Sequence, residues 1–497
     1  AAQTHTPTMH DLYKLKARVY KHGGDVGTAA LIMDQAREMD KQDRYINTKH
    51  VKYLYRADQP EKAVDIASLF TKDESGDSDG SATFAEKVRT FYNMQVIWME
   101  LEEGASRLRT GDYALALKRF TSVHDHFDTF YEDQFDFHSY CMRKSTIRAY
   151  MGMVEMVDDQ HNRPRHRQAS RGAVRAYCAL FDEETAAEAA KQSGGEETEA
   201  MRTVAARKVA AAEGKAAEEK LMAKGGKDAS QGGRQPNVKD VDPEGALFVQ
   251  QAMGKDGKGA GGLLDAAWAL IDDLRKNDPS DAEAAWLAFD TAERMAKPML
   301  QLRACKDLQK CATTPTEKSE AALRVARLAV SAAAGEGPMK ALLVGQVDTL
   351  MGGAGSAQAF VSAFVGSAGD SNEGRIGAAE VLSRLPEAAR PDDWKKTAEG
   401  LLGGVRFATG TPAALGLAKR ALSAWAAMGA GGEVAFAAEA RKTFPLATCF
   451  GATSPAVLAV GGDTFYADGR VELNEEHRMK KEKKQQEGGQ EEEKKKE

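Results

Sequence analysis

Small and aromatic residues recur at a fixed spacing near the start of this 497-residue chain. The first set is Ala17, Tyr20, Gly24, Val26, Ala29, Met33 and Ala36. A second set, displaced by 34 residues from Ala17 to Val51, is Val51, Leu54, Pro60, Ala63, Ala67 and Phe70. A third set, which follows an insertion at residues 71–84, is Gly104, Gly111, Tyr113, Ala116 and Phe120. This period is typical of paired helices that pack closely through their small residues, so it predicts a tetratricopeptide-like solenoid.

Helical spacing of apolar residues continues through most of the chain, and alternating strand patterns are nearly absent. The sequence therefore predicts an all-α fold. We find no run of about 18 apolar residues, so we expect no membrane span. Five cysteines without a CxxC pair favour a reducing, intracellular compartment. The formal net charge of −6 does not identify a partner.

Composition divides the chain into four expected segments. They are tetratricopeptide-type repeats over 1–185, a charged Ala/Gly-rich connector with one exposed helix over 186–242, a second helical repeat block over 243–450, and a C-terminal segment with a disordered charged tail over 451–497. The insertion at 71–84 is acidic and rich in Gly and Ser, which predicts a mobile loop. In the second block, Pro279 and Trp286 indicate a helix, a turn and another helix.

The stretch EDQFDFHSYCMRK, residues 132–144, has the composition of an active site. A metal site could use His124, His126, His138 and Cys141, and a cysteine nucleophile could pair Cys141 with His138. A repeat interface is the favoured interpretation, because Phe135, Phe137 and Tyr140 suit the space between stacked helices. We therefore expect no catalytic residue and no metal in this chain.

Two basic clusters are candidate anion sites. In the first, KLKARVYKH is followed one repeat later by Lys49 and Lys52, and stacking of the repeats would form a concave basic surface. The second, HNRPRHRQASRGAVR, contains five arginines that suit contact with ribosomal RNA: Arg163, Arg165, Arg167, Arg171 and Arg175. A solvated helix face is the alternative interpretation of each cluster.

Three longer stretches resemble one protein family: HTPTMHDLYKLKARVYKHGGD, DRYINTKHVKYLYRA and EDQFDFHSYCMRKSTIRAY. They closely resemble the auxiliary, or scaffold, subunit of the N-terminal acetyltransferase A complex. The resemblance is strongest over residues 5–185 and continues collinearly through NDPSDAEAAW to ARKTFPLATCFG. Members of the family are longer at the N-terminus, so this chain resembles their C-terminal portion.

The resemblance implies a superhelix that transfers no acetyl group and wraps a small catalytic subunit, which uses acetyl coenzyme A to acetylate the N-termini of nascent chains. It also implies a cytoplasmic scaffold anchored to the ribosome, through ribosomal RNA and proteins near the tunnel exit, with no DNA or membrane partner. Inositol hexakisphosphate, the structural ligand of the family, would contact Lys16, Arg18, Lys21, His22, Lys49 and Lys52. Tyr45 and Trp98 would face the catalytic subunit.

Two alternatives come from other functional classes. The first is a tetratricopeptide co-chaperone-type adaptor that binds acidic C-terminal peptides, although the insertion at 71–84 would interrupt its groove. The second is a metal-dependent enzyme that uses the histidine and cysteine set named above. Neither accounts for the long stretches that carry the family resemblance.

Overall fold

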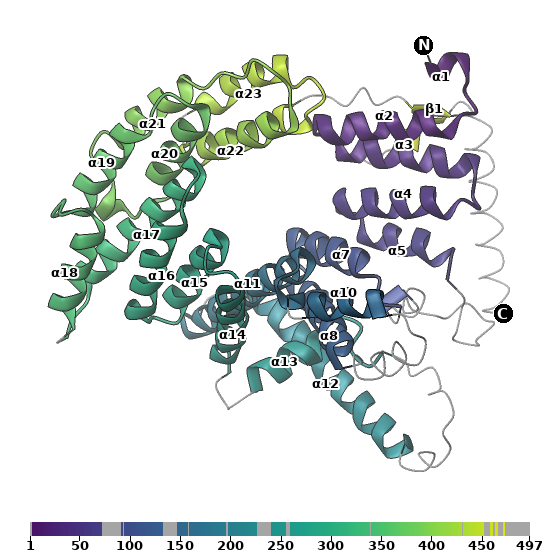
Figure 1. The fold of residues 1–497 in the computed structure, drawn as a ribbon, viewed down its shortest axis with the longest axis horizontal. Helices are drawn as coiled ribbons and strands as arrows, with labels where there is room; N and C mark the ends of the chain where they lie inside the picture. Colours follow the sequence, from purple (N-terminus) through teal and green to yellow (C-terminus); the bar gives the residue numbers. More distant parts are fainter. Residues whose placement is uncertain are drawn as a thin grey trace. The chain divides into compact units, whose positions relative to one another are not determined.

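The computed structural model describes residues 2–71, 91–92, 94–132, 147–157, 159–194, 197–225, 240–254, 259–337, 339–429, 431–451, 458–460, 463–465 and 471–472. Helices account for most of these residues (Figure 1), which confirms the predicted all-α fold. The chain forms two units, one made of residues 1–57 and 405–497 and the other of residues 58–404. The four segments expected from composition stay a prediction.

The first unit begins with stacked helices and ends with a second helix pair and a short sheet. Its elements are α1 (Ala2–His5), α2 (His10–Gly23), α3 (Val26–Met39), α4 (Arg44–Arg56), α22 (Pro412–Met428), α23 (Gly432–Thr443), η4 (Thr448–Phe450), β1 (Leu458–Val460), β2 (Asp463–Phe465) and β3 (Val471–Glu472). The three strands form an antiparallel sheet in the order β1-β2-β3 and precede the charged tail that was expected to be disordered, which lies outside the described residues.

The turn between α2 and α3 confirms the first predicted repeat. Gly24 has φ 98°, a left-handed conformation that favours glycine, and the N–H groups of Gly24 and Asp25 donate to carbonyls in the last turn of α2. The Asp25 side chain then accepts from Thr28 N at 2.9 Å and caps α3. A Cβ on Gly24 would lie 3.0 Å from Leu415 of α22. The sequence repeat did not predict that C-terminal residues pack against α2.

The second unit is a longer series of helices. Its elements are α5 (Pro60–Ser68), α7 (Ile97–Thr110), α8 (Tyr113–Glu132), α10 (Ile147–Val157), η1 (Gln160–Asn162), α11 (Pro164–Gln192), α12 (Glu199–Gly225), α13 (Ala246–Gly254), α14 (Gly261–Asn277), α15 (Ala282–Arg294), α16 (Pro298–Cys311), α17 (Pro315–Ala334), α18 (Lys340–Leu350), α19 (Ala357–Ser367), α20 (Asn372–Arg384), η3 (Glu387–Ala389) and α21 (Trp394–Gly403). From α14 to α17, each helix packs on the next along the chain. The predicted helix, turn and helix around Pro279 is the α14–α15 pair.

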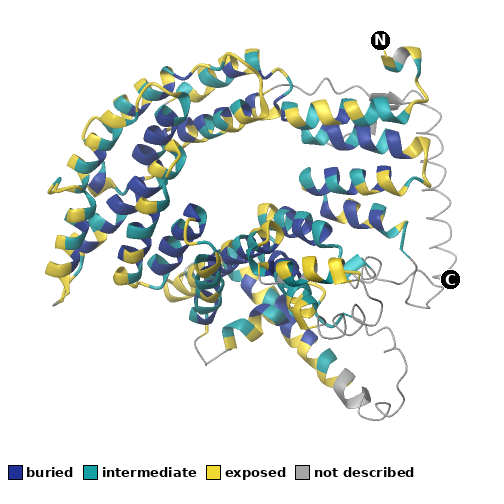
Figure 2. Cartoon of the chain, in the orientation of Figure 1, coloured by how far each residue is buried: buried dark blue, intermediate teal, exposed yellow. Residues whose placement is uncertain are grey.

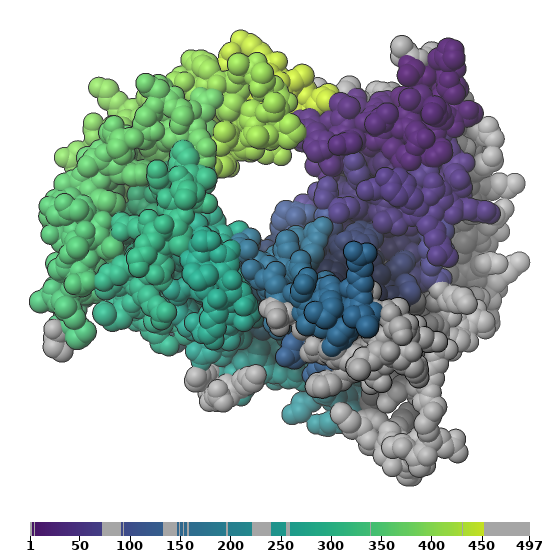
Figure 3. Space-filling view, viewed as in Figure 1, coloured from purple at the N-terminus to yellow at the C-terminus, as the bar shows by residue number. Residues whose placement is uncertain are grey.

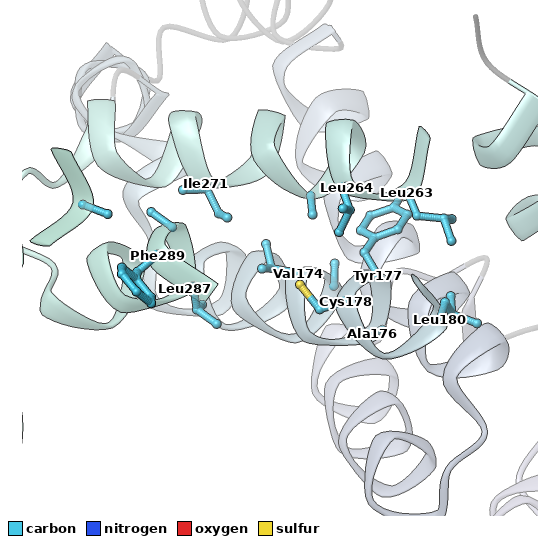
Figure 4. Close-up of a cluster of buried hydrophobic side chains, with 14 of the residues drawn as sticks. Val174, Ala176, Tyr177, Cys178, Leu180, Leu263, Leu264, Ile271, Leu287 and Phe289 are labelled. Atoms are coloured by element: carbon cyan, nitrogen blue, oxygen red, sulfur yellow. The ribbon is translucent and has the colours of Figure 1, made fainter. Parts of the chain in front are cut away.

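Most helices of this unit have buried residues on one face and exposed residues on the other (Figure 2). The main core lies where α11 packs against α8, α14 and α15, and Figure 4 shows Val174 and Tyr177 of α11 together with Leu264 of α14. The side chains from α15 to α21 form one continuous surface (green in Figure 3).

Phe120 of α8 shows why small residues recur in the repeat. A Cβ added to Gly104 of α7 would lie 2.9 Å from the Phe120 ring, and one added to Gly172 of α11 would lie 2.5 Å from it. Phe120 is only 2% exposed. Glycine on the two neighbouring helices therefore makes room for the aromatic side chain that the sequence pattern predicted.

The connector forms the one helix that was expected, but this helix is not fully solvated. α12 packs against α11 and α13, and it buries Val204 and Ala211 almost completely. Arg207 lies 3.3 Å from Glu184 of α11 and also bonds Glu183. The sequence of α12 has only a narrow apolar stripe and no broad apolar face, so its packing against α11 was not predicted.

Among the described residues, the structure contains no helix whose length and apolar character would let it cross a membrane.

Candidate anion-binding groove

A basic groove with a volume of about 760 Å³ lies in the first unit, between α2 and α4. Its lining consists of Asp11, Lys14, Leu15, Arg18, Lys21, His22, Met33, Tyr45, Lys49, Lys52, Tyr53 and Arg56. Six of these side chains are cations, and among the described residues that line the groove Asp11 alone is acidic. Its carboxylate lies 2.5 Å from Lys14 Nζ. The described lining residues therefore carry more positive than negative charge, which favours binding of an anion.

Helical periodicity decides which basic residues of α2 reach the groove. Lys14, Arg18 and Lys21 are spaced by four and three residues, which places them on one face of the helix. Lys16 lies about 200° around the axis from both Lys14 and Arg18. It does not line the groove, although the sequence analysis included it in the ligand set.

The basic residues of α4 follow the same rule. Lys49, Lys52 and Arg56 are spaced by three and four residues and line the opposite wall of the groove. Lys49 and Lys52 were predicted from the sequence as ligands, whereas Arg56 was not. Lys14, which also lines the groove, was not in the predicted ligand set. Projection of the two helices with 3.6 residues per turn would have added both residues and removed Lys16.

Two tyrosines of α4 face the lysines of the groove. Lys14 Nζ lies 4.9 Å from the centre of the Tyr45 ring, and Lys49 Nζ lies 5.2 Å from the same ring. Lys21 Nζ lies 5.8 Å from the centre of the Tyr53 ring. These distances suit cation–π attraction, which holds the ammonium groups near the groove.

The crowded cations change the titration of two groups in the groove. Desolvation, followed by the charges of Arg56, Arg18, Lys49 and Lys52, lowers the pKa of Lys21. Desolvation, followed by the charges of Lys21, Arg18 and Arg56, lowers the pKa of His22. Both shifts have the direction expected where positive charge exceeds negative charge. An anion in the groove would relieve this repulsion.

A cavity of about 830 Å³ in the second unit has a different charge pattern. Its three arginines each lie near a carboxylate: Arg107 is 2.8 Å from Glu61, Arg119 is 3.1 Å from Glu103, and Arg207 is 3.3 Å from Glu184. This balance gives the cavity no excess positive charge comparable with that of the groove.

The two aromatic residues expected at a protein interface lie in different units. Tyr45 lies near the start of α4, next to the capping Asp43, and is 56% exposed. Trp98 lies in the first turn of α7 and is partly buried. Tyr45 is thus accessible to a partner, whereas Trp98 presents only part of its surface.

The arginine segment forms the end of η1 and the start of α11, and three of its five arginines pair with carboxylates of residues 278–283. Arg167 lies 2.8 Å from Asp278 and 2.9 Å from Asp281. Arg171 bonds Asp281, and Arg175 bonds Glu283. An RNA phosphate would have to compete with these carboxylates.

Arg163 and Arg165 are more accessible than Arg167 and Arg171. Arg163 lies 3.9 Å from Asp159, and exposed Arg165 donates to the Gln168 side chain at 3.1 Å. RNA contact by the segment stays a prediction.

The histidines of the hypothetical metal site have separate partners. His124 Nδ1 and His166 Nε2 are 2.9 Å apart and share a hydrogen bond, whereas His126 Nε2 lies 2.9 Å from a carboxylate oxygen of Glu100. His138 and Cys141 lie outside the described residues, as do Phe135, Phe137 and Tyr140. Within the described part of the chain, no three His, Cys, Asp or Glu residues are arranged to hold a metal ion.

Comparison with known families gives a match over residues 1–308, more than half of the chain. The matching family is described as "N-terminal acetyltransferase A, auxiliary subunit". The matched residues include the whole basic groove, since its lining extends only from Asp11 to Arg56.

Individual relatives have the same kind of description. The chain is 37% identical over 317 residues to the N-terminal acetyltransferase A complex auxiliary subunit NAA15 of Arabidopsis thaliana. The aligned residues make up 62% of this chain and 32% of the relative. It is 37% identical over 182 residues to the human N-alpha-acetyltransferase 16, NatA auxiliary subunit. The aligned residues make up 37% of this chain and 20% of the relative. The chain thus spans a third or less of the length of these relatives.

A similar solved structure is described as "Structure of Naa15/Naa10 bound to HypK-THB". The sequences are 28% identical, and the similarity covers 70% of this chain and 42% of that chain with a TM-score of 0.48.

Proposed function

Since this chain belongs to the family of N-terminal acetyltransferase A auxiliary subunits, we propose that it is a non-catalytic scaffold that holds and shapes a catalytic acetyltransferase subunit. The observation that carries the proposal is the family match over residues 1–308. In the proposed complex the catalytic subunit binds acetyl coenzyme A and modifies the N-termini of nascent chains in the cytoplasm. The stacked helices give the scaffold an extended surface for such a partner.

Co-purification tests the scaffold role. We expect this chain to co-purify in a stoichiometric complex with the catalytic subunit of N-terminal acetyltransferase A. Tyr45→Ala should weaken the complex, because an exposed aromatic side chain is a typical source of interface energy. Tyr13→Ala in α2 removes a tyrosine that does not line the groove and serves as the matched control. Failure of the unaltered chain to bind the catalytic subunit would contradict the proposal.

The basic groove is the proposed site for inositol hexakisphosphate as a structural ligand. Lys and Arg side chains bind phosphate through charge-assisted hydrogen bonds, each of which contributes about 1.5–3 kcal/mol. Four of the six cations in the groove belong to the ligand set that the family resemblance implies: Arg18, Lys21, Lys49 and Lys52. The other two are Lys14 and Arg56. His22 lies on the same surface.

Charge reversal tests the groove with a matched control. Lys49→Glu places an acid in the groove, whereas Lys16→Glu makes the same change of charge on the other face of α2. By calorimetry, we expect Lys49→Glu to weaken inositol hexakisphosphate binding at least tenfold, about 1.4 kcal/mol, and Lys16→Glu to have a much smaller effect. Equal losses in the two variants would show that only the total charge matters. A groove that prefers an acidic peptide ending in EEVD would instead support the co-chaperone alternative.

We also propose that the scaffold anchors the complex to the ribosome. Exposed Arg163 and Arg165 support this proposal, because arginines bind RNA phosphates. Replacement of both by Glu should reduce sedimentation of the chain with ribosomes. Replacement of the paired Arg167 would disturb its contacts with Asp278 and Asp281 as well, so it is a poor test. Unchanged sedimentation of the double variant would contradict a role for this segment.

A further inference from the structure

Lys21 has a special position among the lysines of the groove. It lies in the last turn of α2 and is partly buried, with its Nζ 5.8 Å from the centre of the Tyr53 ring. Charges from both walls act on it: Arg18 from its own helix, and Lys49, Lys52 and Arg56 from α4. Asp11, the acid of the groove lining, is ten residues away, about 15 Å along the helix. No carboxylate among the described lining residues is therefore close to Lys21.

This environment has two chemical consequences. Desolvation and the four neighbouring cations lower the pKa of Lys21, which increases the fraction of free amine at neutral pH. The free amine, and not the ammonium ion, is the nucleophile. The same cations attract molecules that carry phosphate groups, and such fields raise the local concentration of an oppositely charged ligand by about 10- to 1,000-fold.

We propose that Lys21 is an acetylation site, at which acetyl coenzyme A held in the groove by its phosphates transfers its acetyl group to Nζ. This inference rests on the proposed role of the groove as an anion site. The free amine attacks the thioester carbonyl carbon, a C–N bond forms and the C–S bond breaks. Coenzyme A leaves as the thiolate, and the proton lost from Nζ passes to that thiolate or to water. The products are an amide at Lys21 and free coenzyme A.

Acetylation of Lys21 and polyphosphate binding oppose each other. The amide has no charge and only one N–H donor, so the modified groove binds a polyphosphate more weakly. A polyphosphate already in the groove excludes acetyl coenzyme A and restores the charge on Lys21, since nearby negative charge raises the pKa of a lysine. Occupied scaffolds are thus protected, whereas empty scaffolds accumulate the modification.

Lys16 provides an internal control, because it lies on the same helix and is also partly buried but does not line the groove. The unmodified chain is incubated with acetyl coenzyme A, and site-resolved mass spectrometry measures the acetylation rates of Lys21 and Lys16. We expect a ratio of about 10 or more. Inositol hexakisphosphate should reduce the Lys21 rate alone, and Arg56→Gln should lower it by weakening both anion attraction and the cationic field.

A phosphate-free thioester, S-acetyl-N-acetylcysteamine, separates the two effects of the groove. The ratio of rates should be smaller with this thioester than with acetyl coenzyme A, because phosphate attraction is lost. Equal rates at Lys21 and Lys16 with acetyl coenzyme A would overturn the inference. If calorimetry then shows that inositol hexakisphosphate binds, the proposed groove ligand stands and only the acetylation site is refuted. Faster modification of Lys21 without polyphosphate binding would support the acetylation site and refute that ligand.

Discussion

Substitution of Gly172 by alanine should destabilise the second unit, although alanine is the better helix former. On an exposed helix this exchange stabilises a protein by about 0.5–1 kcal/mol. At Gly172 the new Cβ would lie 2.5–2.7 Å from three atoms of the Phe120 ring. Overpacking of this kind costs about 1–3 kcal/mol. The upper part of this range applies, because the same end of the ring also lies against Gly104 of α7. We expect a net loss of about 1–2 kcal/mol.

Urea-induced unfolding followed by circular dichroism measures this difference. Gly345→Ala in α18 is the matched control, since a Cβ there meets nothing within 4 Å; it should stabilise the chain by about 0.5–1 kcal/mol. Phe120→Leu in the Gly172→Ala background should cost less than the sum of the two single changes, because the smaller side chain makes room for the new Cβ. If Gly172→Ala is as favourable as Gly345→Ala, the explanation of the small residues in this repeat is wrong.

Three further predictions concern titration and charge. Burial, with the charges of His166 and His161, lowers the pKa of His124 to about 3, so the folded state binds fewer protons than the unfolded state. Neutral His124 contributes its full share of stability above about pH 6.5, and this contribution is lost as the pH falls below that value, by up to about 1.4 kcal/mol per pH unit. The free energy of unfolding of His124→Asn should therefore depend less on pH than that of the unaltered chain. Asp281 caps α15 and accepts hydrogen bonds from two arginines, so Asp281→Ala should cost about 2–4 kcal/mol. In contrast, Asp272→Ala removes an exposed ion pair and should cost at most about 1 kcal/mol in urea unfolding. Similar losses of stability in Asp281→Ala and Asp272→Ala would contradict the prediction. The pKa of His22 is lowered in the empty groove, and a bound anion would raise it. Binding of inositol hexakisphosphate, measured by calorimetry, should therefore strengthen as the pH falls from 7.5 towards 6. His22→Gln should remove part of this pH dependence.

Local sequence patterns predicted the elements that depend on neighbouring residues. Gly24 marks the turn between α2 and α3, and Gly104 and Phe120 meet where the third repeat placed them. These positions are predictable because one repeat forms its own contacts. The basic surface was predictable for the same reason, since α2 and α4 begin successive repeats.

Contacts between distant parts of the sequence could not be predicted in this way. Arg167 and Arg171 look like an RNA-binding cluster until their partners, Asp278 and Asp281, are known. The packing of Leu415 against Gly24 joins residues that are separated by most of the chain. Arg56 was missed for a simpler reason, because a count of clustered charges ignores the helical projection that brings it beside Lys49 and Lys52.

We propose that this chain holds and shapes a catalytic subunit and transfers no acetyl group to nascent chains itself. The most direct test is the initial rate at which the catalytic subunit acetylates a peptide with an N-terminal serine, alone and with an equimolar amount of this chain. We predict a higher rate in the mixture and no activity of this chain alone beyond the spontaneous rate. An unchanged rate with no complex formed, or catalysis by this chain alone, would contradict the account.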